Sequence, residues 1–202
     1  ILKTKYLLGL QNLRPLSSEG INNALNNDSH AKISEKLYAN ALTLLKDEKQ
    51  LFPLREKEVY YLPLEEASHD AFLQELSKEI KVKKISSKEI QSIPEKAVVI
   101  IGLHKDNSTA YKPYKISWES KRLINQVKSR NKVILNVVGS PYALQDVDIS
   151  GISSVLVSYE NNPLSMKATA EAYLGKQKIN GRLPVVVNEQ IKYGMGIDVP
   201  KQ

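Results

Sequence analysis

Three apolar runs between positions 96 and 159 constrain the fold of the chain more than any other feature. They are "KAVVIIGL" (96–103), "KVILNVVG" (132–139) and "SSVLVSY" (153–159). Each is nearly continuous in Val, Ile and Leu, whereas a strand with one face in water alternates apolar and polar residues. Strands that are covered on both faces have this continuous composition, and they are typical of parallel sheets. We therefore expect the three runs to be adjacent interior strands.

Helical patterns lie between these strands and before them. Ser117 can cap a helix with Leu123, Ile124 and Val127 inward, and Asn162-Pro163 can open another that closes at Gly175. Earlier in the chain, "EVYYLPL" (58–64) and "IKVKKI" (80–85) are predicted strands. The remaining expected core-facing helical positions are Ile33, Leu37, Ala41 and Leu44 in one segment, and Phe72, Leu76 and Ile80 after a cap at Ser68. Alternating strands and helices indicate an α/β fold, a three-layer sandwich with a mostly parallel central sheet and helices on both faces.

Two segments differ in composition. Residues 1–30 are polar and irregular after the first turn and include "NNALNNDSH" (22–30), which is typical of a linker. Residues 31–202 contain all of the predicted strands. A chain of 202 residues has the length of one ordinary domain or of one domain with an appendage.

Composition excludes some classes of site. The chain has no Cys, so it has neither disulfides nor thiolate metal ligands. Its net charge of +7 comes from lysines spread over the whole length. The densest stretch, "KVKKISSK" (81–88), lacks the Arg and aromatic residues of a nucleic-acid surface and is interpreted as a solvated edge strand. No apolar run approaches the roughly 20 residues of a membrane span.

Most motifs that carry chemistry are missing. His30, His69 and His104 have no second ligand at metal spacing, so we predict no metal site. The chain has neither a dinucleotide-binding turn nor a phosphate loop, so we predict no cofactor. Ser140-Pro141 follows a strand, but it starts a helix more simply than it forms a nucleophile elbow. Glu160 follows another strand without an identifiable partner acid.

The loop "GLHKDNSTAYKPYK" (102–115) is the longest irregular segment after any of the buried strands. Ligands in open α/β sheets bind beyond the carboxyl ends of strands, and long loops are often functional. An ordinary connection between a strand and a helix explains the segment equally well.

The order of motifs along the chain carries a resemblance. In order they are "ILKTKYLLGL", "YANALTLLKDEKQLFPL", "VVIIGL", "VVGSPYAL", "VLVSYENN", "ATAEAYLGKQKINGRLPVVV" and "YGMGI". The series resembles the C-terminal half of glycoside hydrolase family 3, whose members pair a (β/α)8 barrel with an α/β sandwich domain. The resemblance implies that 1–30 are the end of the preceding barrel and a linker, and that 31–202 are the sandwich. It also implies that "GRLPVVV" is the closing strand, with Gly181 permitting a turn before it.

The resemblance implies a non-catalytic domain of a retaining glycosidase. The family's Asp nucleophile lies in the barrel, and nothing here matches its motif. The β-glucosidase branch carries an acid/base Glu in the loop after the strand "VVIIG", where this chain has Leu103, His104 and Lys105. The chain therefore resembles the bacterial β-N-acetylglucosaminidases, which keep a His–Asp pair on the barrel. A β-glucosidase domain and an independent flavodoxin-like binding module remain the alternatives.

The same resemblance implies partners and a place for substrate. The partner is the barrel of the same polypeptide, with a carbohydrate at the domain interface. The ending "IDVPKQ" is compatible with a following β-lactamase-like domain. The β-N-acetylglucosaminidases that the chain resembles act in bacterial cell-wall turnover, so the resemblance implies the bacterial periplasm or cell envelope, with the cytoplasm as the alternative. The substrate-facing candidates on the 102–115 loop are His104, Asp106, Asn107 and Tyr111, with Tyr114 as a further stacking ring.

Overall fold

The computed structural model describes residues 1–14, 17–106, 108–109 and 111–202. These residues form two compact units, Ile1–Ile33 and Ser34–Gln202. The first unit contains α1 (Leu2–Leu7), the 3₁₀ helix η1 (Leu10–Asn12), α2 (Ile21–Leu25) and the first turns of α3 (Asp28–Ala41). None of its described residues is buried. The assignment of residues 1–30 to the end of a barrel stays a prediction.

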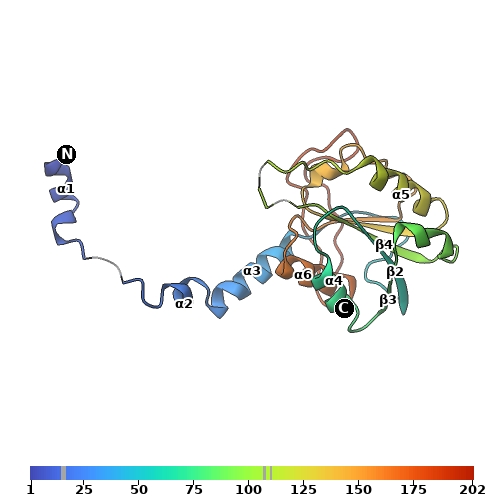
Figure 1. Ribbon diagram of the computed structural model, residues 1–202, viewed down its shortest axis with the longest axis horizontal. Helices are drawn as coiled ribbons and strands as arrows, with labels where there is room; N and C mark the ends of the chain where they lie inside the picture. Colours follow the sequence, from blue (N-terminus) through green and yellow to red (C-terminus); the bar gives the residue numbers. More distant parts are fainter. Residues whose placement is uncertain (15–16, 107, 110) are drawn as a thin grey trace. The chain divides into compact units, whose positions relative to one another are not determined.

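The second unit is built on one six-stranded sheet with the order β1-β6-β5-β4-β2-β3 (Figure 1). The strands are β1 (Thr43–Asp47), β2 (Glu58–Leu64), β3 (Lys81–Lys84), β4 (Val98–His104), β5 (Lys132–Val138) and β6 (Ser154–Val157). All neighbouring pairs are parallel except β1 with β6. The three runs predicted as adjacent interior strands are β4, β5 and β6, so that prediction is confirmed.

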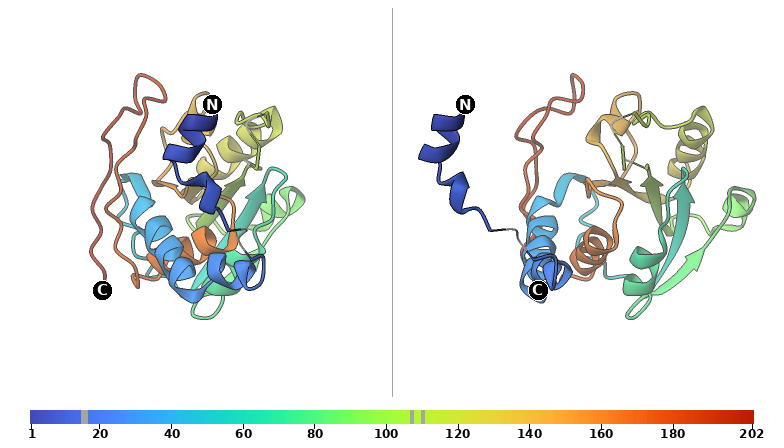
Figure 2. Two further views of the ribbon diagram at one scale, coloured as in Figure 1. Left: turned by 90° about the vertical axis from the view of Figure 1, so that its left-hand side faces the viewer. Right: turned by 60° about the vertical axis from the view of Figure 1, so that its left-hand side comes forward.

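Helices cover both faces of this sheet (Figures 1 and 2). The end of α3, α4 (Asp70–Leu76) and α6 (Pro163–Tyr173) pack on one face. On the other face lie α5 (Trp118–Lys128), the 3₁₀ helices η2 (Ser87–Ser92) and η3 (Pro141–Leu144), and part of the C-terminal segment. The predicted three-layer α/β sandwich is therefore confirmed. None of the described helices is long and apolar enough to cross a membrane.

Local signals explain most of the element boundaries. Ser117 accepts a hydrogen bond from the Ser120 N–H and caps α5, and Asn162 accepts one from the Ser165 N–H and caps α6. The Glu89 carboxylate accepts the Ser86 N–H at 2.8 Å in the predicted capping box of η2. Strand β3 is an edge strand, and two of its lysines form ion pairs with Glu58 on β2, as expected of a solvated edge.

The segment after α3 differs from the prediction. The helical spacing suggested that Leu44 continues α3, but the helix ends at Ala41 and Leu44 lies in β1. Ile33 and Leu37 are exposed at 57% and 67%. The run Leu42–Leu45 is buried, because both faces of β1 are covered and such a strand needs apolar residues on both sides. That same run also satisfies a helical period, which is why the sequence pattern was ambiguous.

The C-terminal segment also differs from the prediction. "GRLPVVV" is not a regular strand. The segment forms two isolated bridges, Leu44 with Ile197 and Ile179 with Val199, and further backbone hydrogen bonds such as the one from the Leu183 N–H to the Met195 carbonyl. Gly181 has no positive φ angle; a side chain there would collide with the carbonyl oxygens of Ala41 and Leu42, so the position needs Gly for close approach. The turn conformation belongs to Gly194, at φ +82°.

Candidate functional site at the carboxyl ends of β2 and β4

Two connections meet where β2 and β4 end. The strands are parallel neighbours, and Leu64 is in register with Leu103. Glu65 and Glu66 follow β2, and Lys105 follows β4, so their side chains start from the same edge of the sheet. This is the edge at which open α/β sheets bind ligands.

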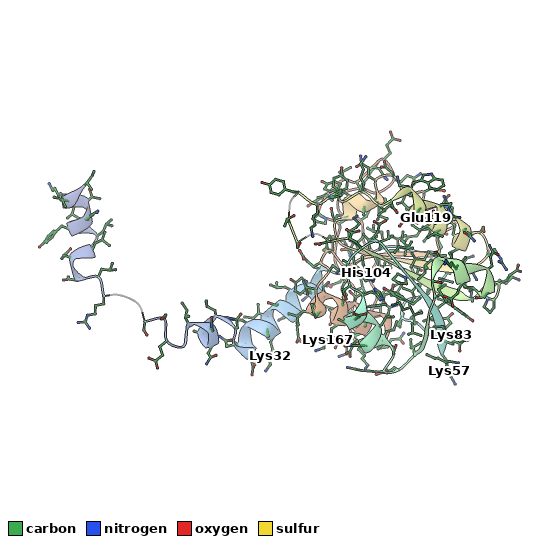
Figure 3. All side chains as sticks on the ribbon, viewed as in Figure 1. Lys32, Lys57, Lys83, His104, Glu119 and Lys167 are labelled. Carbon is green, nitrogen blue, oxygen red and sulfur yellow. The ribbon has the colours of Figure 1, made fainter. Side chains whose placement is uncertain are left out.

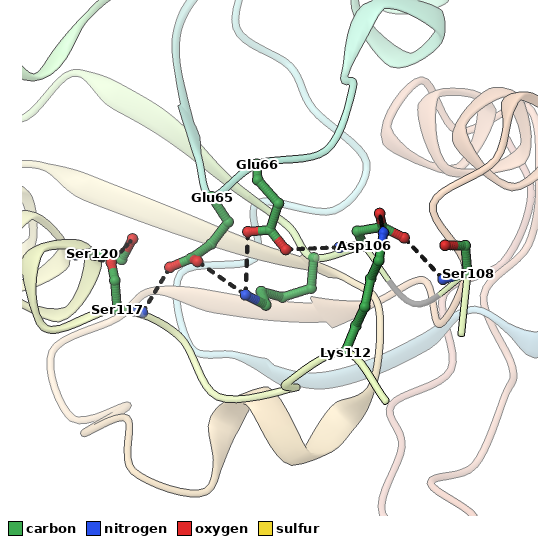
Figure 4. A network of polar contacts seen from close by, with 8 residues as sticks. Glu65, Glu66, Asp106, Ser108, Lys112, Ser117 and Ser120 are labelled. Atoms are coloured by element: carbon green, nitrogen blue, oxygen red, sulfur yellow. Dashed lines mark hydrogen bonds and ion pairs between the residues drawn. The ribbon is translucent and has the colours of Figure 1, made fainter. Parts of the chain in front are cut away.

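Lys105 forms an ion pair with both glutamates (Figure 4). Its Nζ lies 3.2 Å from Oε2 of Glu65 and 3.2 Å from Oε2 of Glu66. The side chains of Lys105 and Glu65 are 7% and 6% exposed, whereas that of Glu66 is 51% exposed. The group therefore contains one buried ion pair and one carboxylate that reaches solvent.

The two glutamates also hold both ends of the β4–α5 connection. The Ser117 N–H, just before α5, donates to Oε1 of Glu65 at 2.9 Å. The Asp106 N–H, just after β4, donates to Oε1 of Glu66 at 3.2 Å. Asp106 in turn accepts the Ser108 N–H at 2.9 Å and forms an ion pair with Lys112 (Figure 4). The turn after β2 thus fixes where this connection begins and ends.

The charged forms of these groups are stabilised. Burial raises the pKa of the Glu65 carboxyl, but hydrogen bonds from Ser120 and Ser117 and the Lys105 ammonium outweigh it, so the pKa is lowered. Burial lowers the pKa of Lys105, but its two glutamate partners outweigh that effect and the pKa is raised. The hydrogen bonds from Lys112 and Ser108 hold the pKa of Asp106 well below its usual range. Glu65, Lys105 and Asp106 are therefore ionised at neutral pH.

Glu65 has an uncommon backbone conformation, with φ at +71°. Such angles are rare outside Gly, Asn and Asp, and surrounding contacts must maintain them. Here the contacts with Lys105 and Ser117 supply that restraint. The conformation turns the carboxylate back over the sheet edge.

A cavity of about 240 Å³ lies beside this network. The ring of Tyr114, which lines it, packs at a centroid distance of 5.7 Å from Tyr142, and its hydroxyl donates to Oε1 of Gln145 at 3.3 Å. The residues lining the cavity are Lys105, Asp106, Thr109, Lys112, Pro113, Tyr114 and Ser140. A larger cavity of about 640 Å³ lies between η2 and α5, and Glu65 and Ser117 line that one.

His104 lies inside the domain, directed away from this network. Its side chain belongs to the face of the sheet that packs on α4, and the residue is fully buried. Nε2 is hydrogen-bonded to the Tyr61 hydroxyl, and Nδ1 lies 2.8 Å from Oδ1 of Asn161. Figure 3 shows the labelled His104 among the side chains at the sheet.

The hydrogen bonds assign the tautomer of this histidine. The amide of Asn161 donates to the Ser68 carbonyl at 3.1 Å, so its Oδ1 is an acceptor. His104 Nδ1 therefore carries the proton, and Nε2 accepts from the Tyr61 hydroxyl. Gly102 makes this pairing possible, because a side chain there would occupy the space of the Tyr61 hydroxyl and the His104 ring. Burial, reinforced by the nearby charge of His69, outweighs the Asn161 hydrogen bond and lowers the pKa of His104 to about 4.

The predicted loop residues are in different environments. His104 is in the interior, Asp106 is part of the charged network, and Tyr111 is 98% exposed. Asn107 lies outside the described residues. Glu160 is on the surface. That the loop faces a substrate stays a prediction for all four candidates.

The sequence interpretation missed Glu65, Glu66 and Lys105. Two acidic residues directly after a predicted strand were a usable signal, because the carboxyl ends of parallel strands meet at one edge. Among the described residues, no group of three or more metal-ligating side chains comes together. The arrangement offers ionised carboxylates, a nearby tyrosine ring and a small cavity, a combination that suits hydroxyl-bearing molecules.

Comparison with known proteins relates this fold to enzymes that act on sugars. No protein-family model and no curated protein sequence matches the chain. Among solved structures, the β-glucoside phosphorylase BglX is similar over 93% of this chain and 38% of its own, with TM-score 0.71 and 18% identity. A β-glucosidase from Listeria innocua is similar over 90% and 30%, with TM-score 0.69 and 15% identity.

A third structure, a glycoside hydrolase family 3 β-N-acetylglucosaminidase from Paenibacillus sp. str. FPU-7, is similar over 87% of this chain and 35% of its own. Its TM-score is 0.60 and its identity 18%. The chain has the fold of part of these enzymes. It spans about a third of the length of each of the three. The fold expected from the motif series is thereby confirmed.

Proposed function

We propose that this chain is the non-catalytic C-terminal α/β sandwich domain of a family 3 glycoside hydrolase, a retaining β-N-acetylglucosaminidase. The observation that carries the proposal is the fold similarity, which covers about nine tenths of this chain but about a third of each enzyme. The order of sequence motifs supports the same family. The remaining length in such a protein is the catalytic barrel, which is the proposed partner.

The charges at the sheet edge support a non-catalytic role. A retaining glycosidase of the β-glucosidase type, the alternative that would carry its acid/base carboxyl on this domain, needs two carboxyl groups on either side of the scissile bond, one of them an acid with a raised pKa. Here the pKa values of Glu65 and Asp106 are lowered, so both carboxyls are ionised and poor proton donors at neutral pH. The Glu65 carboxylate is also occupied by Lys105 and Ser117.

The proposed contribution of the domain is binding. The network places Asp106 beside the 240 Å³ cavity, and the rings of Tyr114 and Tyr111 lie on the same connection. Carboxylates accept hydrogen bonds from sugar hydroxyls, and tyrosine rings pack on the apolar face of a pyranose. The domain therefore holds part of a saccharide at the interface with the barrel.

Two measurements on the chain test this function. Aryl β-N-acetylglucosaminides should give no release of the aryl group above the blank, because no nucleophile is present. N-acetylglucosamine, titrated to millimolar concentration, should shift the amide resonances of residues around 105, 106 and 114. Hydrolysis that disappears in Glu66→Gln or Glu160→Gln would contradict the non-catalytic assignment, and the absence of shifts would contradict the binding role.

A further inference from the structure

A second cavity of the sandwich, which we call the η2–α5 cavity, has no part in the function proposed above. It has a volume of about 640 Å³ and lies between η2 and α5. Most small-molecule sites have volumes of roughly 300–1,000 Å³. The η2–α5 cavity is within that range, whereas the cavity beside Asp106, at about 240 Å³, is below it. A ligand of more than one sugar ring therefore finds more room in the η2–α5 cavity.

The way in which the chain crosses from β3 to β4 explains this cavity. The two strands lie on either side of β2, so their connection passes over one face of β2 (Figure 1). That connection, described throughout from residue 85 to 97, has the six-residue 3₁₀ helix η2 as its helical part. So short a helix covers less of a sheet than an α-helix of ordinary length. The carboxyl end of β2 therefore forms the floor of a cavity between η2 and α5.

The η2–α5 cavity has an apolar floor and a polar rim. Four serines, three glutamates and one lysine line it, together with aliphatic residues from β2, the end of β3 and α5. The aliphatic residues are Leu62, Pro63, Leu64, Ile85 and Leu123. Apolar side chains with a few polar groups placed around them are the usual lining of a ligand site.

The polar groups on the α5 side of the rim are engaged within the protein. Ser117 caps α5, and Glu119 binds Arg122 through two nitrogens, at 2.9 Å and 2.6 Å. The Glu65 carboxylate accepts hydrogen bonds from Lys105 and from the Ser117 N–H. These contacts hold the wall of the cavity in place.

The η2 side of the rim keeps polar groups for a ligand. Within the described part of the chain, Lys84 forms no ion pair and the Ser87 hydroxyl forms no hydrogen bond. Glu89 accepts the N–H and the hydroxyl of Ser86 through Oε2, which leaves Oε1 free. Those hydrogen bonds lower the pKa of the Glu89 carboxyl, so it is ionised at neutral pH. Lys84, Ser87 and Glu89 are all exposed.

A donor and an acceptor on the same rim indicate the class of ligand. The Lys84 ammonium only donates hydrogen bonds, and the ionised Glu89 carboxylate only accepts them. A hydroxyl group does both, so neighbouring hydroxyls of one sugar ring satisfy the two residues together. An anionic group is matched by Lys84 alone, and a cationic group by Glu89 alone. The aliphatic floor suits the C–H face of the ring.

We propose that the η2–α5 cavity is a second saccharide site, which binds a β-linked chain of at least two sugar units through Lys84, Ser87 and Glu89. The inference rests on the proposed function, that the domain binds saccharides, and adds a separate place and a longer ligand. The domain then holds a glycan chain at a point apart from the cavity beside Asp106.

The test uses two sugars and four forms of the chain. N-acetylglucosamine and its β-linked dimer are titrated separately, and Kd is obtained from the amide chemical shifts. The forms are the unchanged chain, Lys84→Met, Ser87→Trp and Lys88→Met. Methionine removes the ammonium group of Lys84, and tryptophan at position 87 fills the cavity. Lys88 is the matched control, because it is exposed on the same helix and is not among the residues that line the cavity.

We expect the dimer to shift the amides of residues 84–89 and 119–123, and to bind there at least about tenfold more tightly than N-acetylglucosamine, because two rings make more contacts than one. Lys84→Met should raise the Kd of the dimer about tenfold, as expected for the loss of a charged hydrogen bond. Ser87→Trp should abolish these shifts, and Lys88→Met should leave them unchanged. The N-acetylglucosamine shifts around residues 105, 106 and 114 should persist in every form.

The pattern of shifts separates the inference from the proposed function. Shifts around residues 105, 106 and 114 without any at the η2–α5 cavity, or cavity shifts that survive in Ser87→Trp, would overturn the inference and leave the proposed function intact. Shifts confined to the η2–α5 cavity would support the second site and contradict the binding role of the first. If neither sugar shifted any amide, both would fail.

Discussion

His104 and Lys105, neighbouring residues at the end of β4, are both buried, but they lie on opposite faces of the sheet and differ in charge. His104 points to the face covered by α4 and α6, where it is neutral and hydrogen-bonded to Tyr61 and Asn161. Lys105 points to the other side, where it is charged and lies between Glu65 and Glu66. A neutral hydrogen-bonded group costs little to bury, whereas a buried charge is stable only with its partner in place. The difference suggests that one residue supports the core and the other supports the site.

The largest expected effect comes from removing the charge of Lys105. Lys105→Met keeps the length of the side chain but leaves the buried Glu65 carboxylate without its ammonium partner. We expect the free energy of unfolding to fall by about 3–5 kcal/mol, measured by urea denaturation. Lys112→Met is the matched control, because its ion pair with Asp106 lies at the surface, where such pairs contribute little.

A second substitution sharpens this measurement. Adding Glu65→Gln to Lys105→Met removes the unpaired charge while keeping an acceptor for the Ser117 N–H, so it should recover a large part of the loss. If the double variant were less stable than Lys105→Met, the stability lost in Lys105→Met would come from lost packing and not from an unpaired charge. The contrast between a neutral His104 and a Lys105 that depends on its charge partner would then be wrong.

His104 should give the chain a pH-dependent stability in a defined window. Its pKa in the folded chain is lowered to about 4 by burial, whereas an unfolded chain has a His pKa of about 6.5. Above pH 6.5 both states are neutral, so the contribution of His104 is complete. As the pH falls to about 4, the unfolded chain takes up the proton first, and about 3 kcal/mol of stability is lost.

The measurement is the unfolding free energy at several pH values between 4.5 and 7, for the unchanged chain and for His104→Gln. The variant should lose most of the slope. Part of it should remain, because His69 packs beside His104 and burial also lowers its pKa. An identical slope in both proteins would show that His104 is protonated as easily in the folded chain as in the unfolded one.

The fold was predictable because its strongest signals are local or periodic. The runs that became β4, β5 and β6 are apolar on both faces, and the caps at Ser117 and Asn162 are short-range patterns. The two segments that were assigned wrongly are the run Leu42–Leu45 at the start of β1 and the C-terminal segment. The first satisfies both a helical and a buried-strand pattern, and the second satisfies neither. In the C-terminal segment one of the two bridges, Leu44 with Ile197, joins residues that lie far apart in the chain.

The site was less predictable, because its members come together only through the sheet. The ion pairs of Lys105 span 40 and 39 positions in sequence, and neither strand predicts the other. His104 was expected in the loop because it follows the apolar run, but strand alternation, with the open space at Gly102, directs it inward. The register between β2 and β4, which no local pattern specifies, decides both placements.

Tyr111 should show the smallest effect on stability and a clear effect on binding. Its side chain is 98% exposed, so Tyr111→Ala should change the unfolding free energy by less than about 0.5 kcal/mol. If the ring packs on a sugar, the same substitution should raise the Kd for N-acetylglucosamine severalfold. The Kd is obtained from the amide chemical shifts in a titration. Tyr193→Ala, at an exposed ring on the C-terminal segment, is the control and should leave both quantities unchanged. Unaltered binding in Tyr111→Ala would remove this residue from the site and leave Glu66, Asp106 and Tyr114 as its members.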